Sequence, residues 1–141
     1  MSNSFRSASE FREVIDQIFV MMDTDPEMGP KLREADVPQR FEFEDLDLVV
    51  NIRAARPGED TQLVWEWTDD VDWEPKVKMA MSSETANKYF QGKENIAMAI
   101  ARRRIKTGGD VKAALALIPI VKPVFAHYRE LVAAQYPHLV V

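Results

Sequence analysis

The sequence predicts an α+β fold, in which helices from both ends of the chain cover one face of a central sheet. Near both ends, apolar residues recur every three or four positions, which is the period of an amphipathic helix. Between residues 40 and 81 they alternate with polar residues, which is the period of a strand. Because an apolar sheet face has to be covered, the terminal helices are its expected cover.

The first element is an amphipathic helix, expected over residues 8–22 with Ser7 or Ser9 as its N-cap. Its apolar stripe consists of Phe11, Val14, Ile15, Ile18, Phe19 and Met22. A second short helix is expected over 26–35, because Asp25 is a good N-cap and proline is favoured at the first helical position.

Four strands are expected next, joined by a turn at 57–60 and by an acidic loop at 68–75. Their chain order predicts an antiparallel meander. One face collects the apolar side chains Phe41, Phe43, Val50, Ile52, Trp65, Trp67, Met79 and Met81. The other face is expected to be solvated and carries Glu42, Glu44, Arg53, Gln62, Glu66, Lys76 and Lys78.

Two helices are expected after the strands, on either side of a glycine. The first starts at Ser82 or Ser83 and runs to about Gln91, because a serine beside an acidic first turn favours a helix start. Gly92 supplies the left-handed residue that ends a helix. The second helix is expected over 96–102.

The last third of the chain is expected to contain a short strand and two more helices. Residues 103–107 are predicted to form a fifth strand, and the glycines at 108–109 turn the chain. A helix is expected over 110–117, because Pro119 interrupts the helical pattern. The final helix is expected over 121–135.

The net charge of −5 conceals an uneven distribution of charge. Residues 1–74 carry 7 basic and 19 acidic residues, and residues 75–141 carry 11 basic and 4 acidic residues. Either the two halves neutralise each other in the fold, or the basic half forms a face for anionic lipid headgroups. The overall acidity argues against a nucleic-acid partner.

The composition indicates one domain over residues 1–141, with residues 1–6 expected to be flexible. The sequence has no cysteine, which excludes disulfides and thiolate chemistry and fits a cytoplasmic location. We find no secretory signal pattern, no apolar run of the ~20 residues that a membrane-spanning helix needs, and no peroxisomal address.

No residue is predicted to be catalytic, and no metal or cofactor is predicted. His127 and His138 have no recognisable nucleophile pattern with which to form a catalytic pair. The carboxylates of the 68–75 loop lack the spacing of a calcium loop. Asp110 after the paired glycines argues against a phosphate-binding loop.

The densest basic cluster follows the expected 96–102 helix and consists of Arg102, Arg103, Arg104 and Lys106. One interpretation is a solvated turn that pairs with the acidic half. The other is a patch that contacts a membrane surface or an anionic headgroup, at roughly 1 kcal/mol per basic residue.

From Val77 to about Leu131, the chain resembles the sterol carrier protein type 2 (SCP-2) family. The resemblance lies in the order of its motifs: the apolar strand 77–81, a Ser-Ser-Glu helix start, Gly92-Lys93, the small-residue helix 96–101, the strand 104–106, and Gly109-Asp110 opening another helix. Together these motifs cover roughly 40% of the chain.

The resemblance implies a five-stranded mixed, mostly antiparallel sheet with one face covered by about five helices, enclosing an apolar tunnel. Members of the family bind sterols, fatty acids, fatty acyl-CoA or phospholipids and are not themselves enzymes. Arg103 stands where a glycine is expected, and the peroxisomal tail is missing. Both departures favour a stand-alone microbial member.

The leading hypothesis is therefore non-enzymatic binding, and transfer or presentation, of a hydrophobic ligand between the sheet and the helices. The expected lining consists of Trp65, Trp67, Met79, Met81, Phe90, Ile96, Ile100, Leu115, Ile118 and Phe125. The alternatives are a protein-interaction or homodimerisation module, or an accessory subunit of a lipid-metabolising enzyme, with the apolar groove closed by a partner. A lipid-modifying enzyme is the weakest hypothesis, because no nucleophile and base are identifiable together.

Overall fold

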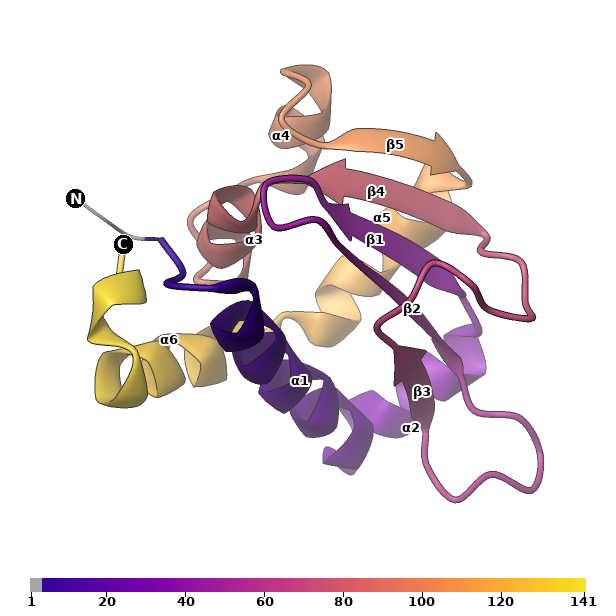
Figure 1. The fold of residues 1–141 in the computed structure, drawn as a ribbon. Helices are drawn as coiled ribbons and strands as arrows, with labels where there is room; N and C mark the ends of the chain where they lie inside the picture. Colours follow the sequence, from indigo (N-terminus) through magenta and orange to yellow (C-terminus); the bar gives the residue numbers. More distant parts are fainter. Residues whose placement is uncertain (1–3) are drawn as a thin grey trace.

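The computed structural model describes residues 4–141 and contains one sheet with helices against it (Figure 1). Its helices are α1 (Ala8–Thr24), α2 (Met28–Ala35), α3 (Ser83–Phe90), α4 (Ile96–Ala101), α5 (Val111–Val121), α6 (Pro123–Gln135) and the 3-10 turn η1 (Pro137–Leu139). Its strands are β1 (Gln39–Phe43), β2 (Leu48–Ala54), β3 (Leu63–Glu66), β4 (Val77–Met81) and β5 (Lys106–Gly109).

The strands form a mixed sheet in the order β3-β2-β1-β4-β5. Only β1 and β4 run parallel, and the other three neighbouring pairs are antiparallel. The five-stranded, mostly antiparallel sheet is therefore confirmed, whereas the predicted four-strand meander is wrong. Alternation shows which face a side chain takes, but not which strand pairs with which. Here the connection after β3 crosses the sheet and places β4 beside β1.

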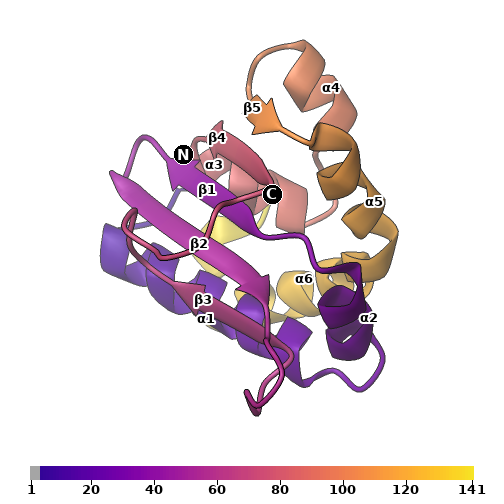
Figure 2. The same cartoon turned by 90° about the vertical axis from the view of Figure 1, so that its right-hand side faces the viewer.

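The helices cover one face of the sheet, which carries the apolar members of the strands (Figure 2). Part of the core lies between this face and α1, where Phe11, Val14, Ile15 and Ile18 are at most 1% exposed. The stripe predicted from three- and four-residue spacing is thus the buried side of α1. The α+β class and its one-sided helix layer are confirmed.

The helix starts follow the capping residues that the sequence indicates. Ser7, Ser82, Asn95 and Asp110 each accept a hydrogen bond from a backbone N–H three residues ahead. Asp25 Oδ1 accepts the backbone N–H groups of Glu27 and Met28 at 2.9 and 2.8 Å, but α2 begins at Met28, so the prediction that Pro26 is its first residue is wrong. These side chains satisfy N–H groups that have no partner within their helices.

Two boundaries near the C-terminal half differ from the prediction. The fifth strand starts at Lys106, because the backbone N–H groups of Arg104 and Ile105 still bond the Ala99 carbonyl at the end of α4. Arg103 makes this turn in the left-handed region, at φ 61°. The fifth helix continues through Pro119 to Val121, since a proline so near the end removes one hydrogen bond without ending the helix.

The outer face of β2 is covered by the connection between β3 and β4, contrary to the predicted solvated face. Asn51 is fully buried and donates through Nδ2 to the Thr68 carbonyl at 2.7 Å. The Arg53 guanidinium lies over the Trp73 ring, 4.9 Å from its centroid, and its side chain is only 11% exposed. The acidic loop therefore packs on the sheet.

Arg53 and Glu59 form a bidentate ion pair, with contacts of 2.8 and 3.0 Å, across the turn after β2. The Arg53 side chain and the Arg56 backbone N–H lower the pKa of Glu59 from 4.5 to about 2. A carboxylate with a lowered pKa in the folded state stabilises the fold above pH 4.5, and this contribution disappears as the pH falls toward 2.

We predict that Glu59→Gln is less stable than the wild-type protein at neutral pH, and that the difference shrinks between pH 4.5 and 2. Urea unfolding at a series of pH values measures this difference. If the difference in stability between the two proteins does not change with pH, the ionised Glu59 does not stabilise the fold as proposed.

Residues 1–3 lie outside the described part, and their expected flexibility stays a prediction, whereas Phe5 packs edge-on against Phe11.

Within residues 4–141, no single helix is long and apolar enough to cross a membrane. The pair α5 and α6, bent by 66° between them, reaches that length and composition only when taken together.

Candidate functional site

An apolar cavity of about 110 Å³ lies between the helix-covered face of the sheet and the helices. Its floor comes from the inward side chains of four strands: Phe41, Phe43, Ile52, Ala54, Leu63, Met79 and Met81. The parallel pairing of β1 with β4 sets Phe41 opposite Met79 and Phe43 opposite Met81. Aromatic rings and flexible thioethers are thereby placed side by side on the floor.

The walls come from helices at both ends of the chain. α1 contributes Ile15, Phe19 and Met22, and α5 contributes Ala114, Leu115, Leu117, Ile118 and Val121. Phe90 and Ile96 also line the cavity, although they lie on different helices. Gly92, with φ 75°, turns the chain between them, so that both helices present an apolar residue to the same space.

Polar groups are few in the lining and consist of Gln39, Arg53 and Tyr89. Burial raises the pKa of Tyr89 to about 12, so this residue stays neutral at physiological pH. Its ring packs against Phe90 and Phe125, with centroids 5.2 Å apart in each pair. The site is thus suited to a hydrocarbon and has one cationic residue at its boundary.

Six of the ten expected lining residues border the cavity: Met79, Met81, Phe90, Ile96, Leu115 and Ile118. The other four, Trp65, Trp67, Ile100 and Phe125, lie outside its wall. The two tryptophans donate from Nε1 to Asp16 Oδ1 at 3.0 and 2.7 Å, which holds them against α1. Ile100 packs against the core, and Phe125 packs edge-on against Tyr89.

Several lining residues were not among the expected ones, although the same patterns mark them. Phe41 and Phe43 belong to the alternating strand pattern, and Ile15, Phe19 and Met22 belong to the first helical stripe. Periodicity assigned each to a buried face without showing which part of that face stays unfilled. The space left between side chains depends on packing in three dimensions, which the sequence pattern does not contain.

Within the described structure, two of the four residues in the basic cluster 102–106 form ion pairs with carboxylates, and two do not. Arg104 forms two 2.9 Å contacts with Glu94, and Lys106 lies 3.4 Å from Glu44. Arg102 and Arg103 are exposed, and neither has an ion pair within the part of the chain that the structure describes. They follow α4, which stands beyond the β5 edge at the top of both ribbon views (Figures 1 and 2).

Neither histidine borders the cavity. His127 is exposed on α6, and His138 Nε2 lies 2.9 Å from Glu10 Oε1, between η1 and the start of α1. The contact between His138 and Glu10 connects the two ends of the described chain.

Comparison with known families agrees with this architecture. The model of the SCP-2 sterol transfer family matches residues 21–122. The chain belongs to this family. The resemblance inferred from the order of motifs in the sequence is therefore confirmed, and membership supports lipid binding or transfer in general terms. No curated protein sequence matches the chain.

Solved structures of SCP-2 domains share the fold. The SCP2 domain of the ubiquinone synthesis protein UbiJ has a TM-score of 0.60 at 8% identity, and the match covers 81% of this chain and 94% of that one. Apo sterol carrier protein 2 from Yarrowia lipolytica has a TM-score of 0.57 at 14% identity, covering 88% and 98%. At such identities, the likeness shows the fold alone.

A larger enzyme contains the same fold. The sec-alkylsulfatase Pisa1 from Pseudomonas sp. matches with a TM-score of 0.55 at 19% identity, over 68% of this chain. The match covers 16% of the sulfatase chain, so this SCP-2 chain spans only a small part of that enzyme's length.

Proposed function

We propose that this SCP-2 protein reversibly binds a hydrophobic ligand in the cavity and transfers it or presents it to other proteins. The ligand classes are fatty acids, fatty acyl-CoA, sterols and phospholipids. The observation that carries the proposal is an almost wholly apolar cavity between sheet and helices in a chain of the sterol transfer family. We propose no catalytic role for it, and a cytoplasmic site of action remains a prediction from the lack of cysteine.

The cavity volume of about 110 Å³ is below the ~300–1,000 Å³ typical of ligand pockets, so a ligand has to enlarge it. Its lining suits such a change. Met79 and Met81 are flexible side chains that re-pack around varied partners. Phe90, Leu115 and Ile118 are only partly buried, so they can move outward at modest cost. We infer that binding opens the space between α5 and the sheet.

The energetics favour exchange over permanent storage. Burying about 14 methylenes contributes roughly 11 kcal/mol relative to water, at ~0.8 kcal/mol each. Relative to a bilayer the gain is close to zero, because the interior of the bilayer is equally apolar. A cavity of this kind therefore equilibrates ligand with membranes.

Mass spectrometry of lipid extracted from the purified protein under denaturing conditions tests the proposal, together with titration of fluorescent fatty acids. We expect a co-purifying lipid or saturable binding in the micromolar range. If no lipid is extracted and the titrations show no saturable binding, the carrier function is wrong.

We propose that exposed residues around α4 make transient contact with membranes. Met98 is 45% exposed, and Arg102 and Arg103 follow it without a carboxylate partner among residues 4–141. Ile96 on the same short helix lines the cavity, so this contact places the ligand site near the bilayer. Arg104 and Lys106 already pair with carboxylates, so we expect them to contribute less.

We predict that Arg102→Glu/Arg103→Glu weakens binding to vesicles containing anionic lipid at least tenfold, at roughly 1 kcal/mol for each basic residue removed. Co-sedimentation with anionic and with zwitterionic vesicles measures the effect. Lys112→Glu/Lys122→Glu, on exposed positions of α5 and its end, is the matched control. Equal losses in both double variants would show that only net charge matters.

A second candidate is an accessory or interaction module, whose groove is closed by a partner or by a second copy of the chain. The sulfatase match favours it, because there the same fold is one part of a larger enzyme chain. Native mass spectrometry distinguishes the candidates. A lipid-free homodimer favours the module, and a lipid-bound monomer favours the carrier.

A further inference from the structure

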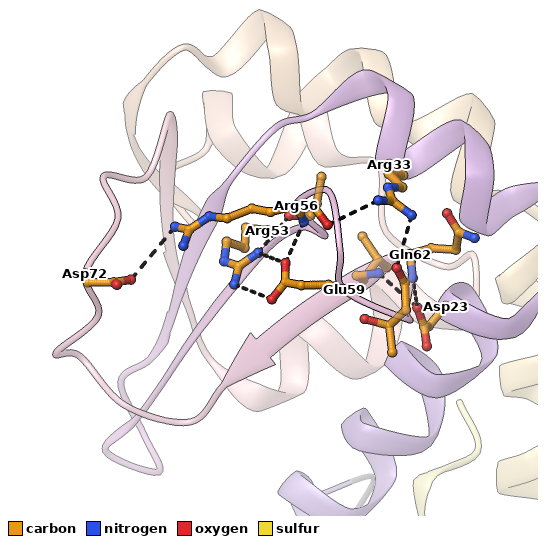
Figure 3. Close-up of polar contacts among 10 residues, drawn as sticks. Asp23, Arg33, Arg53, Arg56, Glu59, Gln62 and Asp72 are labelled. Atoms are coloured by element: carbon orange, nitrogen blue, oxygen red, sulfur yellow. Dashed lines mark hydrogen bonds and ion pairs between the residues drawn. The ribbon is translucent and has the colours of Figure 1, made fainter.

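A second hollow, of about 380 Å³, lies where β2 ends and the chain turns toward β3. Arginines from three places line it: Arg33 on α2, Arg53 on β2 and Arg56 in the turn. Asp36 is the one carboxylate in its lining, so the lining residues carry a net charge of +2. Figure 3 shows the three arginines with their polar partners.

The guanidinium of Arg33 is held by neutral groups. It donates to the backbone carbonyls of Thr61 at 3.4 Å and of Arg56 at 3.2 Å. The structure gives it no ion pair within residues 4–141. Two carbonyl contacts fix the position of this cation without cancelling its charge.

The other two arginines differ in how far their charges are neutralised. The charge of Arg53 is neutralised by the bidentate contact with Glu59, and Arg53 forms part of the wall of the hollow. Among residues 4–141, Arg56 forms one ion pair, with Asp72 at 3.9 Å, and both side chains are more than half exposed. Such a surface pair is worth ~0–1 kcal/mol, so Arg56 is free to take a better acceptor.

Two buried N–H donors in the wall of this hollow lack acceptors in the described structure. They are Nε of Arg53 and Nε1 of Trp73. Buried donors are nearly always hydrogen-bonded in folded proteins, so each unpaired one calls for a specific explanation. Both donors lie on residues that line the same cationic hollow, and both nitrogens are buried beneath its surface.

The hollow and the apolar cavity adjoin each other. Arg53 and Ala54 border both spaces. Along the segment before β1, Asp36 and Pro38 line the hollow, whereas Val37 and Gln39 line the cavity. The two spaces therefore adjoin at the end of β2 and along the segment before β1.

We propose that the hollow binds the anionic headgroup of an amphiphile, a carboxylate or a phosphate or sulfate ester, whose hydrocarbon chain occupies the cavity. Arg33, held by backbone carbonyls, and Arg56, held by one exposed ion pair, supply the positive charge, and Arg53 and Trp73 form part of the wall. Guanidinium groups suit such oxyanions because they donate two parallel hydrogen bonds. The inference rests on the proposed ligand-binding function and narrows it to anionic amphiphiles.

Calorimetric titration with dodecanoate and with 1-dodecanol, both below their aggregation limits, tests the headgroup site. We expect the wild-type protein to bind dodecanoate more tightly. In Arg33→Ala/Arg56→Ala, the affinity for dodecanoate falls about tenfold, and the affinity for dodecanol is unchanged. Lys31→Ala is the matched control, because it removes one positive charge from the exposed side of the same helix. If the double variant does not fold, Arg56→Ala alone replaces it in the titration, because the Arg56 side chain is exposed.

The outcomes separate the headgroup site from the ligand-binding function. If dodecanoate and dodecanol bind equally in wild type and variant, the headgroup site is wrong and the carrier function stands. If neither molecule binds the wild-type protein, the carrier function itself fails. A third titration uses sodium phosphate alone. If phosphate binds as tightly as dodecanoate without weakening dodecanol binding, the hollow is a site for a free anion, which overturns the headgroup assignment.

Discussion

Leu115→Trp is expected to weaken the binding of both dodecanoate and 1-dodecanol at least tenfold. Leu115 is a partly buried residue of α5 that lines the apolar cavity. An indole in place of its isobutyl group fills space that the hydrocarbon chain needs. If the ring excludes two methylenes, the loss is about 1.6 kcal/mol, at ~0.8 kcal/mol each, which corresponds to more than tenfold. Calorimetric titration measures both affinities.

The matched control for this substitution is Leu131→Trp. Leu131 is also a partly buried leucine that packs against the core, but it lies on α6 and does not border the cavity. We expect it to leave both affinities within a factor of two. If Leu131→Trp weakens binding as much as Leu115→Trp does, the effect comes from general repacking, and the cavity is not the binding site.

The sequence predicts most elements of the fold because each signal is local. A capping residue such as Asn95 acts on N–H groups three residues away, and the stripe of α1 depends only on helical spacing. Strand pairing is not local. The prediction placed β4 next to β3 because they are neighbours in the chain, whereas β4 pairs in parallel with β1. The family resemblance, which covers the order of several elements, supplied the mixed sheet that periodicity alone missed.

The residues of the candidate site were likewise predicted only where the signal is local. Met79 and Met81 were expected in the lining because the strand pattern points them inward, and both border the cavity. Trp65 follows the same pattern, yet its indole N–H bonds Asp16, and it lies outside the cavity wall. Arg53 was expected in solvent, because nothing in its strand indicates that Trp73, twenty residues later, lies over it. Contacts between distant segments decide which inward or outward position becomes a site.

Phe11→Ala is expected to lower the free energy of unfolding by about 4 kcal/mol, within the ~3–5 kcal/mol measured for buried phenylalanines. Phe11 is fully buried on α1. Its ring packs edge-on against Phe5, Phe43 and Trp67, at centroid distances of 4.7, 4.5 and 6.2 Å. Single domains have ~5–15 kcal/mol of stability, so this loss is a large fraction of the total. Urea unfolding measures it.

The control is Phe125→Ala, which removes the same ring from a partly exposed position on α6, and we expect about half the loss or less. Equal losses would show that α1 is not the main support of the core. Phe11 does not border the cavity, so the folded fraction of Phe11→Ala should bind dodecanol with wild-type affinity. Leu115→Trp should show the reverse, with binding lost and most of the stability kept. Opposite results in these two variants would separate the packed part of the core around Phe11 from the part beside Leu115 that opens for a ligand.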